Sequence, residues 1–234
     1  MNRRTQFYLY ATPPHDCSYL AQRKATTAFI DPHFPKDMEL YENLSQHGFR
    51  RSGEHLYRPD CHGCHACIAV RVPVAYFQPR RVQKRIWKRN QDLVIVPQAA
   101  VFKQEHFDLY CDYITLRHQG GGMDNPTPDN YIQFLSSQWS ETVFYEFLLE
   151  KQLIAVAVVD KFEQALSAVY TFFSSEHEQR SLGVYAVLWQ IELAKQLNLK
   201  WLYLGYWIEE CQKMSYKTDY QPLEYYQYGV WQAF

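Results

Sequence analysis

The sequence lacks any long apolar stretch and any secretory signal. No apolar run approaches the roughly 18–20 residues that a membrane-spanning helix needs. Arg3 and Arg4 are followed by Pro13, Pro14 and polar residues, where a signal peptide would have an apolar core. Fixed-period repeats and low-complexity tracts are also missing. We therefore expect a cytoplasmic protein with no membrane partner, and 234 residues suffice for one large domain or two small ones.

The chain also has almost no net charge, but its two halves differ in sign. The whole chain carries −1 at pH 7. Residues 1–105 contain 16 Lys and Arg against 9 Asp and Glu, a net charge of +7. Residues 106–234 contain 8 against 16, a net charge of −8. We predict a basic module over 1–105 that binds a polyanion, and an acidic module over 106–234 with a different task.

The positive charge is concentrated in residues 80–89, directly after Pro79, which suits the first turn of a helix. In a helix, Val82 and Ile86 form a short apolar strip that seats it on a core. Four like-charged pairs at i,i+4 then oppose the helix by about 0.2–0.5 kcal/mol each, unless a polyanion lies alongside. Nucleic acid is the leading partner, and a solvated basic face is the alternative. The six cations are Arg80, Arg81, Lys84, Arg85, Lys88 and Arg89.

Three of the six cysteines form a C-x-x-C-x-x-C run at Cys61, Cys64 and Cys67. In a cytosolic chain, clustered cysteines indicate metal binding or thiol chemistry rather than disulfides. A tetrahedral metal site needs a fourth thiolate or imidazole. The alternatives are small apolar packing residues or redox-responsive thiols. Candidates for the fourth ligand are Cys17, His62 and His65.

Hydrophobic periodicity predicts a mixed α/β fold. In the first half we expect a helix over 37–44, a strand and turn over 49–59, and a strand over 68–74 that Pro73 confines to an edge or an end. In the second half, a tight turn at Lys151–Gln152 joins two strands into a hairpin. This order matches an acyl-transferase fold of the GCN5-related N-acetyltransferase type, over 106–234. The second-half elements are helices over 107–118, 130–138 and 181–197, and strands over 142–150, 153–162, 166–174 and 201–206.

Several motifs, taken in order, resemble the aminoacyl-tRNA–protein transferase family. The stretch LGYWIEECQKMSYK at 204–217 is similar to its C-terminal signature. The short length and the cysteine run resemble the bacterial branch, the aspartate/glutamate leucyltransferases. The longer eukaryotic arginyltransferases are its relatives. Further matching motifs lie at 17–20, 57–61, 77–79, 166–173 and 181–183, so the resemblance spans nearly the whole chain.

The resemblance implies transfer of leucine from leucyl-tRNA to the N-terminal Asp or Glu of acceptor proteins, which marks them for degradation. It implies that the six cations of 80–89 bind tRNA and that the transfer itself needs no cofactor. A structural zinc ion or iron–sulfur cluster would be held by the cysteines at 17, 61, 64 and 67. The alternatives are arginyl transfer, a small-molecule N-acetyltransferase, and a non-catalytic RNA-binding module.

The charged ester of aminoacyl-tRNA is already activated, so the site must chiefly align it with the acceptor's amine. Water or a carboxylate such as Glu209 is the candidate proton acceptor. Ser181 is the expected N-cap of the crossover helix, whose start would hold the 3′ end of tRNA. The predicted catalytic group is Tyr206, Lys213, Tyr216 and Lys217. The predicted substrate-binding group is Arg117, Tyr170, Ser181, Gly183 and Trp207.

Overall fold

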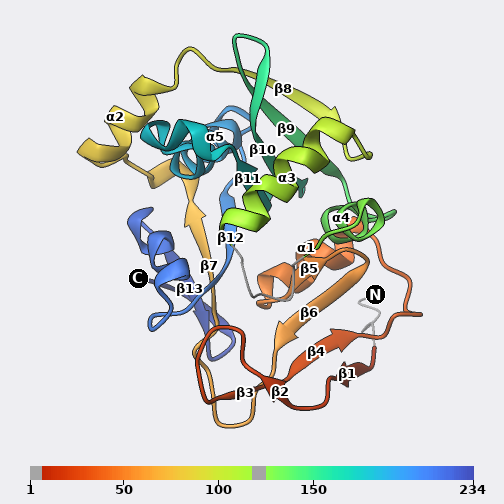
Figure 1. Cartoon of the computed structure of the whole chain (residues 1–234). Helices are drawn as coiled ribbons and strands as arrows, with labels where there is room; N and C mark the ends of the chain where they lie inside the picture. The colour runs from red at the N-terminus through yellow and green to blue at the C-terminus, as the bar shows by residue number, and fades with distance from the viewer. Residues whose placement is uncertain (1–6, 118–124) are drawn as a thin grey trace.

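An eight-stranded sheet runs through the centre of the computed structural model, which describes residues 7–117 and 125–234 (Figure 1). Its order is β14-β13-β7-β12-β11-β10-β9-β8. All neighbouring pairs are antiparallel except β11 and β12, which are parallel. The predicted mixed α/β class is therefore confirmed. The strands are β7 Ile68–Pro73, β8 Val94–Ala99, β9 Thr142–Leu149, β10 Gln152–Lys161, β11 Ala165–Phe173, β12 Trp201–Trp207, β13 Glu224–Gln227 and β14 Val230–Ala233.

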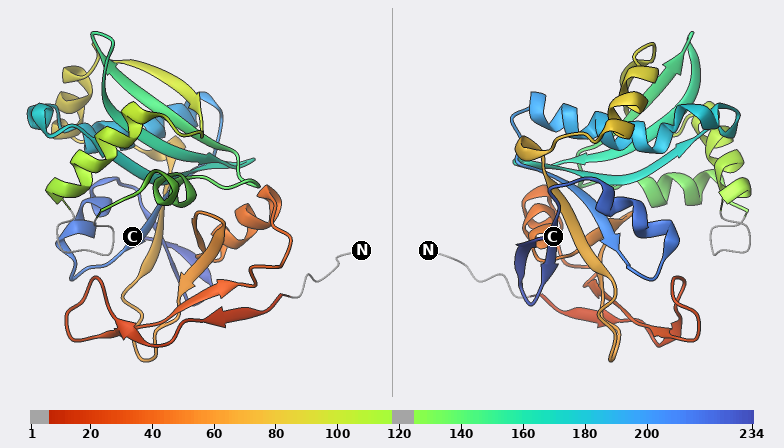
Figure 2. Two further views of the ribbon diagram at one scale, coloured as in Figure 1. Left: turned by 45° about the vertical axis from the view of Figure 1, so that its right-hand side comes forward. Right: turned by 90° about the vertical axis from the view of Figure 1, so that its left-hand side faces the viewer.

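Helices cover both faces of this sheet (Figure 2). Helix α5 (Leu182–Gln196) crosses over between the parallel strands β11 and β12, as predicted. It shares one face with α2 (Arg81–Arg89), whereas α3 (Gln104–Arg117) and α4 (Pro128–Leu135) pack on the other. Successive side chains of β10 point to opposite faces of the sheet. Ala155, Ala157 and Val159 belong to the core under α5, and Val156 and Val158 belong to the core under α3.

The predicted hairpin of β9 and β10 is confirmed, with its turn one residue earlier than expected. Leu149 pairs with Gln152, which leaves Glu150 and Lys151 as a two-residue connection. Both turn residues have positive φ, 48° and 73°. Type I′ turns require this conformation at both positions and match the twist of the flanking strands.

A smaller four-stranded sheet, in the order β1-β4-β6-β5, lies beside the large one. Helix α1 (Met38–Gln46) begins where Asp37 accepts a hydrogen bond from the Leu40 amide at 2.8 Å, a typical N-cap. Tyr41 and Leu44 of α1 share a core with Tyr203 of the large sheet. The remaining elements are β1 Leu9–Ala11, β2 His15–Asp16, β3 Lys24–Ala25, β4 Thr27–Ile30, β5 Arg50–Ser52, β6 His55–Pro59, α6 Gln212–Ser215 and the 3-10 helices η1 Val74–Tyr76, η2 Ser175–Arg180 and η3 Tyr216–Asp219.

Strand β7 lies inside the large sheet, between β12 and β13. Pro73 is its last residue, so the predicted restriction to a strand end holds. The large sheet thus takes β7 and β8 from before residue 105 and its other strands from after it. The functional division at residue 105 stays a prediction. No helix in the described ranges is both long enough and apolar enough to cross a membrane.

Helix α2 packs on a different face from the one predicted. Val82 is 60% exposed, whereas Gln83 and Ile86 are buried, so the expected Val82–Ile86 strip is wrong. The buried Gln83 is stabilised because both ends of its amide are bonded. It accepts from the Arg80 amide at 2.8 Å and donates to the Asp219 carbonyl at 3.0 Å.

Candidate active site

A bulge in β12 shapes the region that follows the parallel strand pair. Tyr203 pairs with Arg71 and Gly205 pairs with Val70, so Leu204 is an extra residue in the ladder. Gly205 has φ +79°, which a side-chain-bearing residue rarely adopts. Residues three apart normally point to opposite faces of a sheet. Because of the extra residue, Tyr203 and Tyr206 instead point the same way, and both rings lie near the Arg50 guanidinium.

Lys217 lies buried against this bulge, with 5% of its surface exposed. Its ammonium group donates to the Tyr206 carbonyl and lies 3.4 Å from the Met214 sulfur. Burial, and after it the charge of the neighbouring Arg50 guanidinium, lower the pKa of Lys217 to about 7. The side chain is therefore available as a neutral amine near neutral pH.

Arg50, on β5, is a second buried cation beside Lys217, and sequence reasoning missed it. Its guanidinium lies 5.0 Å from the Tyr203 ring centroid and 5.8 Å from that of Tyr206. Nη1 donates to the Phe49 carbonyl at 2.6 Å. Within the described residues, Nε and Nη2 are buried and have no hydrogen-bond partner. Because arginine stays protonated in proteins, a positive charge is held permanently next to the Lys217 amine.

The other predicted catalytic residues have different environments. Tyr206 donates its hydroxyl to the Gly48 carbonyl at 2.8 Å, and burial raises its pKa well above the ordinary value, which makes it a structural donor. Tyr216 is 43% exposed, and its ring packs edge-on against Tyr220 at 6.5 Å. Lys213 is exposed on α6. Glu209, the candidate base, is exposed in the turn after β12.

Two predicted substrate-binding residues, Arg117 and Gly183, lie against Phe173 on β11, and a third, Tyr170, is linked to Phe173 through Tyr113. Arg117 places its guanidinium 5.1 Å from the Phe173 ring centroid. Gly183 allows close contact, since a Cβ there would lie 3.0 Å from the same ring. Tyr113 joins the group, with its ring 5.0 Å from Phe173 and 6.2 Å from Tyr170. Sequence reasoning missed Tyr113. The signal that could have found it is its position four residues before Arg117, which places both side chains on one face of the predicted helix.

The two remaining predicted substrate-binding residues, Trp207 and Ser181, lie outside this group. Trp207 packs edge-on against Phe234 at 5.2 Å. Ser181 stands at the N-cap of α5 but forms no side-chain capping bond, so that predicted bond is wrong. Its backbone is left-handed, with φ 53° and ψ 50°, whereas capping residues are extended. In this conformation the hydroxyl is not placed to accept from the first helical amides.

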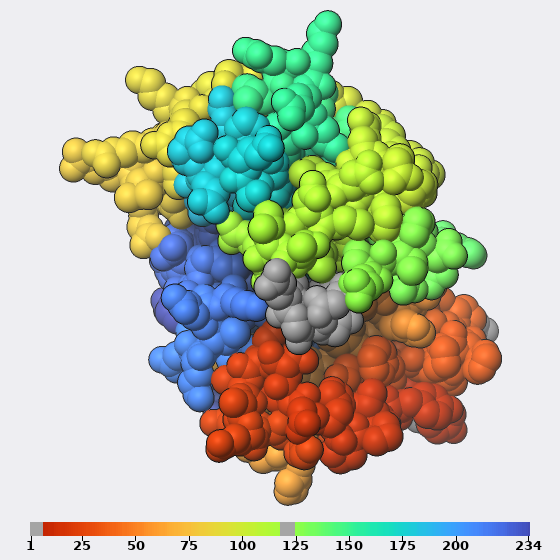
Figure 3. Space-filling model, in the orientation of Figure 1, coloured from red at the N-terminus to blue at the C-terminus, as the bar shows by residue number. Residues whose placement is uncertain are grey.

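Helix α2 presents all six predicted cations to solvent, and in Figure 3 it projects from the surface beside α5. Arg80 forms an ion pair with Asp219 at 2.7 Å, and Arg89 donates to the Gln179 carbonyl. The other four cations form no ion pair with any described residue: Arg81, Lys84, Arg85 and Lys88. Such unpaired charge on one helix suits a polyanion.

The cysteines of the predicted metal site have unequal environments. Cys17 and Cys67 pack with Leu20, Ile208 and Cys211 in a small apolar cluster. Burial, together with the neighbouring thiols, raises the pKa of Cys67 to about 12. In contrast, a backbone hydrogen bond from Ala66, and then one from Arg23, lower the pKa of Cys64.

A zinc ion does not fit these cysteines as they stand. Two sulfurs bound to one zinc at about 2.3 Å each lie within about 4.6 Å of one another. In the described part of the chain, the group of three or more His, Cys, Asp and Glu ligand atoms within 4.8 Å of one another is Glu105, His106 and Glu146. The thiols of residues 17, 61, 64 and 67 do not form such a group, and metal binding by them stays a prediction.

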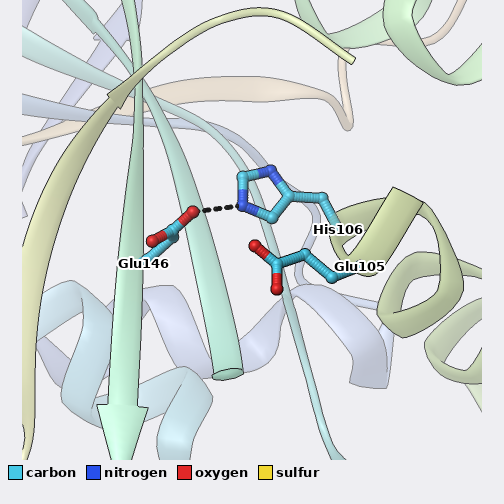
Figure 4. Close-up of side chains that lie close together, drawn as sticks. All are labelled: Glu105, His106 and Glu146. Carbon is cyan, nitrogen blue, oxygen red and sulfur yellow. Dashed lines mark hydrogen bonds and ion pairs between the residues drawn. The ribbon is translucent and has the colours of Figure 1, made fainter. Parts of the chain in front are cut away.

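The group at Glu146 is an ion-pair network that sequence reasoning missed (Figure 4). Glu146 accepts from His106 Nε2 and from Lys103, each at 2.7 Å, and from Gln98 at 3.1 Å. Burial alone raises the pKa of Glu146, but the bonds from Lys103 and His106 outweigh it and the pKa is lowered. Because the Lys103 ammonium already neutralises the same oxygen, a metal cation is opposed here.

Two models of protein families match the sequence of the chain. The model for the N terminus of arginine-tRNA-protein transferase matches residues 15–85, and the model for its C terminus matches residues 105–227. The chain therefore belongs to the arginine-tRNA-protein transferase family, a class of aminoacyl-tRNA–protein transferases, as its motifs predicted.

Relatives similar over nearly their whole length carry a more particular name. A protein of Hahella chejuensis is 53% identical over 223 residues, 95% of each chain, and is named aspartate/glutamate leucyltransferase. Proteins of the same name from Pseudomonas fluorescens and Pseudomonas aeruginosa are 52% and 49% identical. They cover 96% and 100% of this chain, and 95% and 99% of their own length is matched.

A solved structure shares the fold at low identity. L-PGS from Bacillus licheniformis superposes with a TM-score of 0.52 at 12% identity. The match covers 84% of this chain and 62% of that one. This likeness concerns the fold alone, since identity at this level does not carry function.

Proposed function

We propose that the protein transfers leucine from leucyl-tRNA to the N-terminal Asp or Glu of acceptor proteins. The observation that carries the proposal is the similarity of about half identity, over nearly the whole chain, to proteins named aspartate/glutamate leucyltransferase. The new N-terminal leucine marks the acceptor for degradation in the cytoplasm. Two features support our proposal that the large sheet is GCN5-related N-acetyltransferase-like: α5 connects the parallel pair β11 and β12, and β12 carries a bulge.

In this proposal the donor lies along α2 and its 3′ end reaches the start of α5. The exposed cations of α2 neutralise phosphates of the tRNA. The first backbone amides of α5, after Ser181, form the N-terminus of this helix, and a helix N-terminus favours anions. Gly183 lets the Phe173 ring pack closely against the start of α5, and the rings of Tyr170 and Phe173 offer surfaces for the terminal adenine or the leucine.

The acceptor's amine attacks the ester carbonyl, so a C–N bond forms and the bond from the carbonyl carbon to the ribose oxygen breaks. Before the attack the acceptor's ammonium group loses one proton, which Lys217 accepts as a neutral amine. As the C–N bond forms, the nitrogen loses a second proton, which goes to the ribose oxygen so that it leaves as a hydroxyl. Arg50 supports this role because its fixed charge disfavours a second charge on Lys217. Arg117 and Lys213, both exposed, are the cations available for the acceptor's side-chain carboxylate. No cofactor takes part in these steps.

The test supplies the purified chain with radiolabelled leucyl-tRNA or arginyl-tRNA. Acceptors are peptides that begin with Asp, Glu or Asn, and an Asp peptide with an acetylated amine. Label from leucyl-tRNA in the free Asp and Glu peptides alone is the expected result. Label from arginyl-tRNA instead makes the protein an arginyltransferase. Transfer of acetyl groups from acetyl-CoA without tRNA, or tRNA binding without a labelled product, overturns the proposal.

A further inference from the structure

A groove of about 300 Å³ lies where the end of α2, the start of β8 and the outer side of α5 meet. Three aromatic side chains line it: Trp87, Tyr185 and Trp189. Three polar side chains lie in the same lining, namely Gln91, Glu192 and Gln196. The groove therefore combines ring surfaces with hydrogen-bonding groups, which is the composition of a site for a flat polar ligand.

The rings are fixed by packing while part of their surface faces the groove. Tyr185 is buried, and the Trp87 ring lies 5.4 Å from it at an interplanar angle of 49°. Trp189 packs on Tyr145 and Phe147 at 4.7 and 5.5 Å. Trp87 and Trp189 are each only half-buried. A ligand that stacks on them gains contact without first ordering the rings.

The groove continues the cationic surface of α2. Lys84 lies one turn before Trp87, and Lys88 follows it directly; both are exposed and without an ion pair in the described structure. Gln91 lies one turn after Trp87 and donates to its carbonyl at 3.1 Å. A polyanion whose phosphates follow α2 thus passes the mouth of an aromatic groove.

We propose that this groove takes an unpaired nucleobase of the RNA that α2 binds, stacked on Trp87. The inference rests on the proposed tRNA binding. Aromatic side chains beside a positive track are how proteins hold single-stranded nucleic acid. The Glu192 carboxylate only accepts hydrogen bonds, so it favours bases with an exocyclic amine, such as cytosine.

This base is not the aminoacylated terminal adenine. Gly183, at the proposed 3′-end site, contacts Phe173, whereas Tyr185 contacts Trp87 in the groove. Residues two apart on a helix point to nearly opposite sides of it, so the two sites lie on different sides of α5. The nucleotide in the groove is therefore a second unpaired residue, elsewhere in the same tRNA. Its binding lets the protein distinguish bases, which phosphate contacts by themselves do not do.

The test measures binding of two short ribose-phosphate oligomers of equal length to the full chain, an oligocytidylate and an abasic oligomer. The wild-type protein binds the oligocytidylate about 5- to 150-fold more tightly, the range expected for one stacked base. Trp87→Leu keeps an apolar contact with Tyr185 and reduces this preference to near one, with unchanged affinity for the abasic oligomer. Trp87→Phe retains most of the preference.

Two controls separate stacking from charge and from folding. Lys84→Gln weakens both oligomers alike and reduces the salt slope by about 0.7, because one phosphate contact is lost. Tyr228→Leu, at a 95% exposed ring elsewhere, changes nothing. A base preference that persists in Trp87→Leu, or an equal loss for both oligomers, overturns the inference. Since neither oligomer carries an aminoacyl ester, this outcome is independent of whether the chain transfers leucine.

Discussion

Arg51 and Asp160 form a fully buried, bidentate ion pair between β5 of the small sheet and β10 of the large one. Arg51 Nε and Nη2 donate to the two carboxylate oxygens at 2.7 and 2.8 Å, and neither side chain is exposed. Asp160 also accepts from the hydroxyls of Tyr41 at 3.0 Å and Thr142 at 2.6 Å. The carboxylate is thereby fully hydrogen-bonded, which is the condition for burying charge.

We expect Asp160→Asn to destabilise the protein by about 3–5 kcal/mol, because Arg51 then keeps a buried charge without a counter-ion. Denaturant unfolding followed by circular dichroism measures this loss. As a control, Glu210→Gln breaks the ion pair with Arg23 at 3.6 Å, whose side chains are 46% and 62% exposed, and leaves the unfolding midpoint unchanged. A loss below about 1 kcal/mol for Asp160→Asn contradicts the prediction.

The sequence predicted five of the eight strands of the large sheet because their local patterns are strong, and it missed β8, β13 and β14. Residues 142–161 alternate around a tight turn, and residues 181–197 repeat at helical spacing, so periodicity placed the hairpin and α5 within a residue or two. The Val82 prediction failed because a polar residue, Gln83, satisfies both ends of its amide when buried. Apolar spacing does not detect such a residue.

The pairs that build the site join residues distant in sequence, which no local pattern reveals. Arg50 meets Tyr203 and Lys217 only because β5 folds against the bulged β12. His106 and Glu146 are 40 residues apart and meet inside a core. The motif at 204–217 led to the prediction that Lys217 is catalytic, but the burial of this side chain depends on the whole surrounding structure. Its depressed pKa was therefore not predictable from the motif.

Lys217 leads to a prediction about pH. We expect the transfer rate to rise as the pH increases through about 7, because the Lys217 amine loses its proton there. Lys217→Met lowers the rate at pH 7 by about 10²-fold, the lower end for general-base catalysis. Its residual rate follows the acceptor's own amine, with a midpoint at about 7.7–8.0. Lys213→Met, on the exposed neighbour, keeps the wild-type midpoint.

The same lysine affects stability with a defined sign. Its pKa is about 7 when folded and near 10.5 when unfolded, so between these values the unfolded chain binds more protons. Stability therefore rises with pH over this interval, and falls as the pH drops toward 7. Lys217→Met removes this contribution. Unfolding experiments at several pH values that show identical slopes for both proteins rule out a depressed pKa in the folded state.

Arg50 offers an independent test of the same site. Arg50→Gln removes the positive charge beside Lys217, so the pKa of the lysine rises and the midpoint of the rate profile moves to higher pH. Arg50→Lys keeps a charge and stays close to the wild-type midpoint. If Arg50 served only the fold, Arg50→Gln would lower the amount of active protein at every pH and leave the midpoint in place.

The free cations of α2 lead to a prediction about salt. Replacing Lys84 and Arg85 with glutamine removes two phosphate contacts. The slope of the logarithm of tRNA affinity against the logarithm of salt concentration then becomes shallower by about 1.4–1.8. Filter binding at several salt concentrations measures the slope. The double variant Lys24→Gln, Lys36→Gln keeps the original slope: Lys24 is in β3 and Lys36 lies between β4 and α1, and these elements are far from α2 in Figure 1.

Unequal thiol environments lead to a prediction about labelling. In chelator-treated protein, iodoacetamide should modify Cys64 first, because hydrogen bonds from the Ala66 backbone and Arg23 lower its pKa and favour the reactive thiolate. Cys67 should react last, since burial and neighbouring thiols raise its pKa to about 12. Peptide mass spectrometry over a time course gives the order.

Arg23→Gln serves as the matched variant for that order. It removes one of the two bonds that stabilise the Cys64 thiolate, so Cys64 labelling slows while the Cys67 rate stays the same. The same assay on protein that has not been treated with chelator tests whether the predicted metal is bound. Protection of Cys17, Cys61, Cys64 and Cys67 together, lifted by the chelator with release of zinc or iron, is the outcome that a bound metal requires. Labelling of Cys64 that is equally fast with and without chelator contradicts metal binding by these thiols.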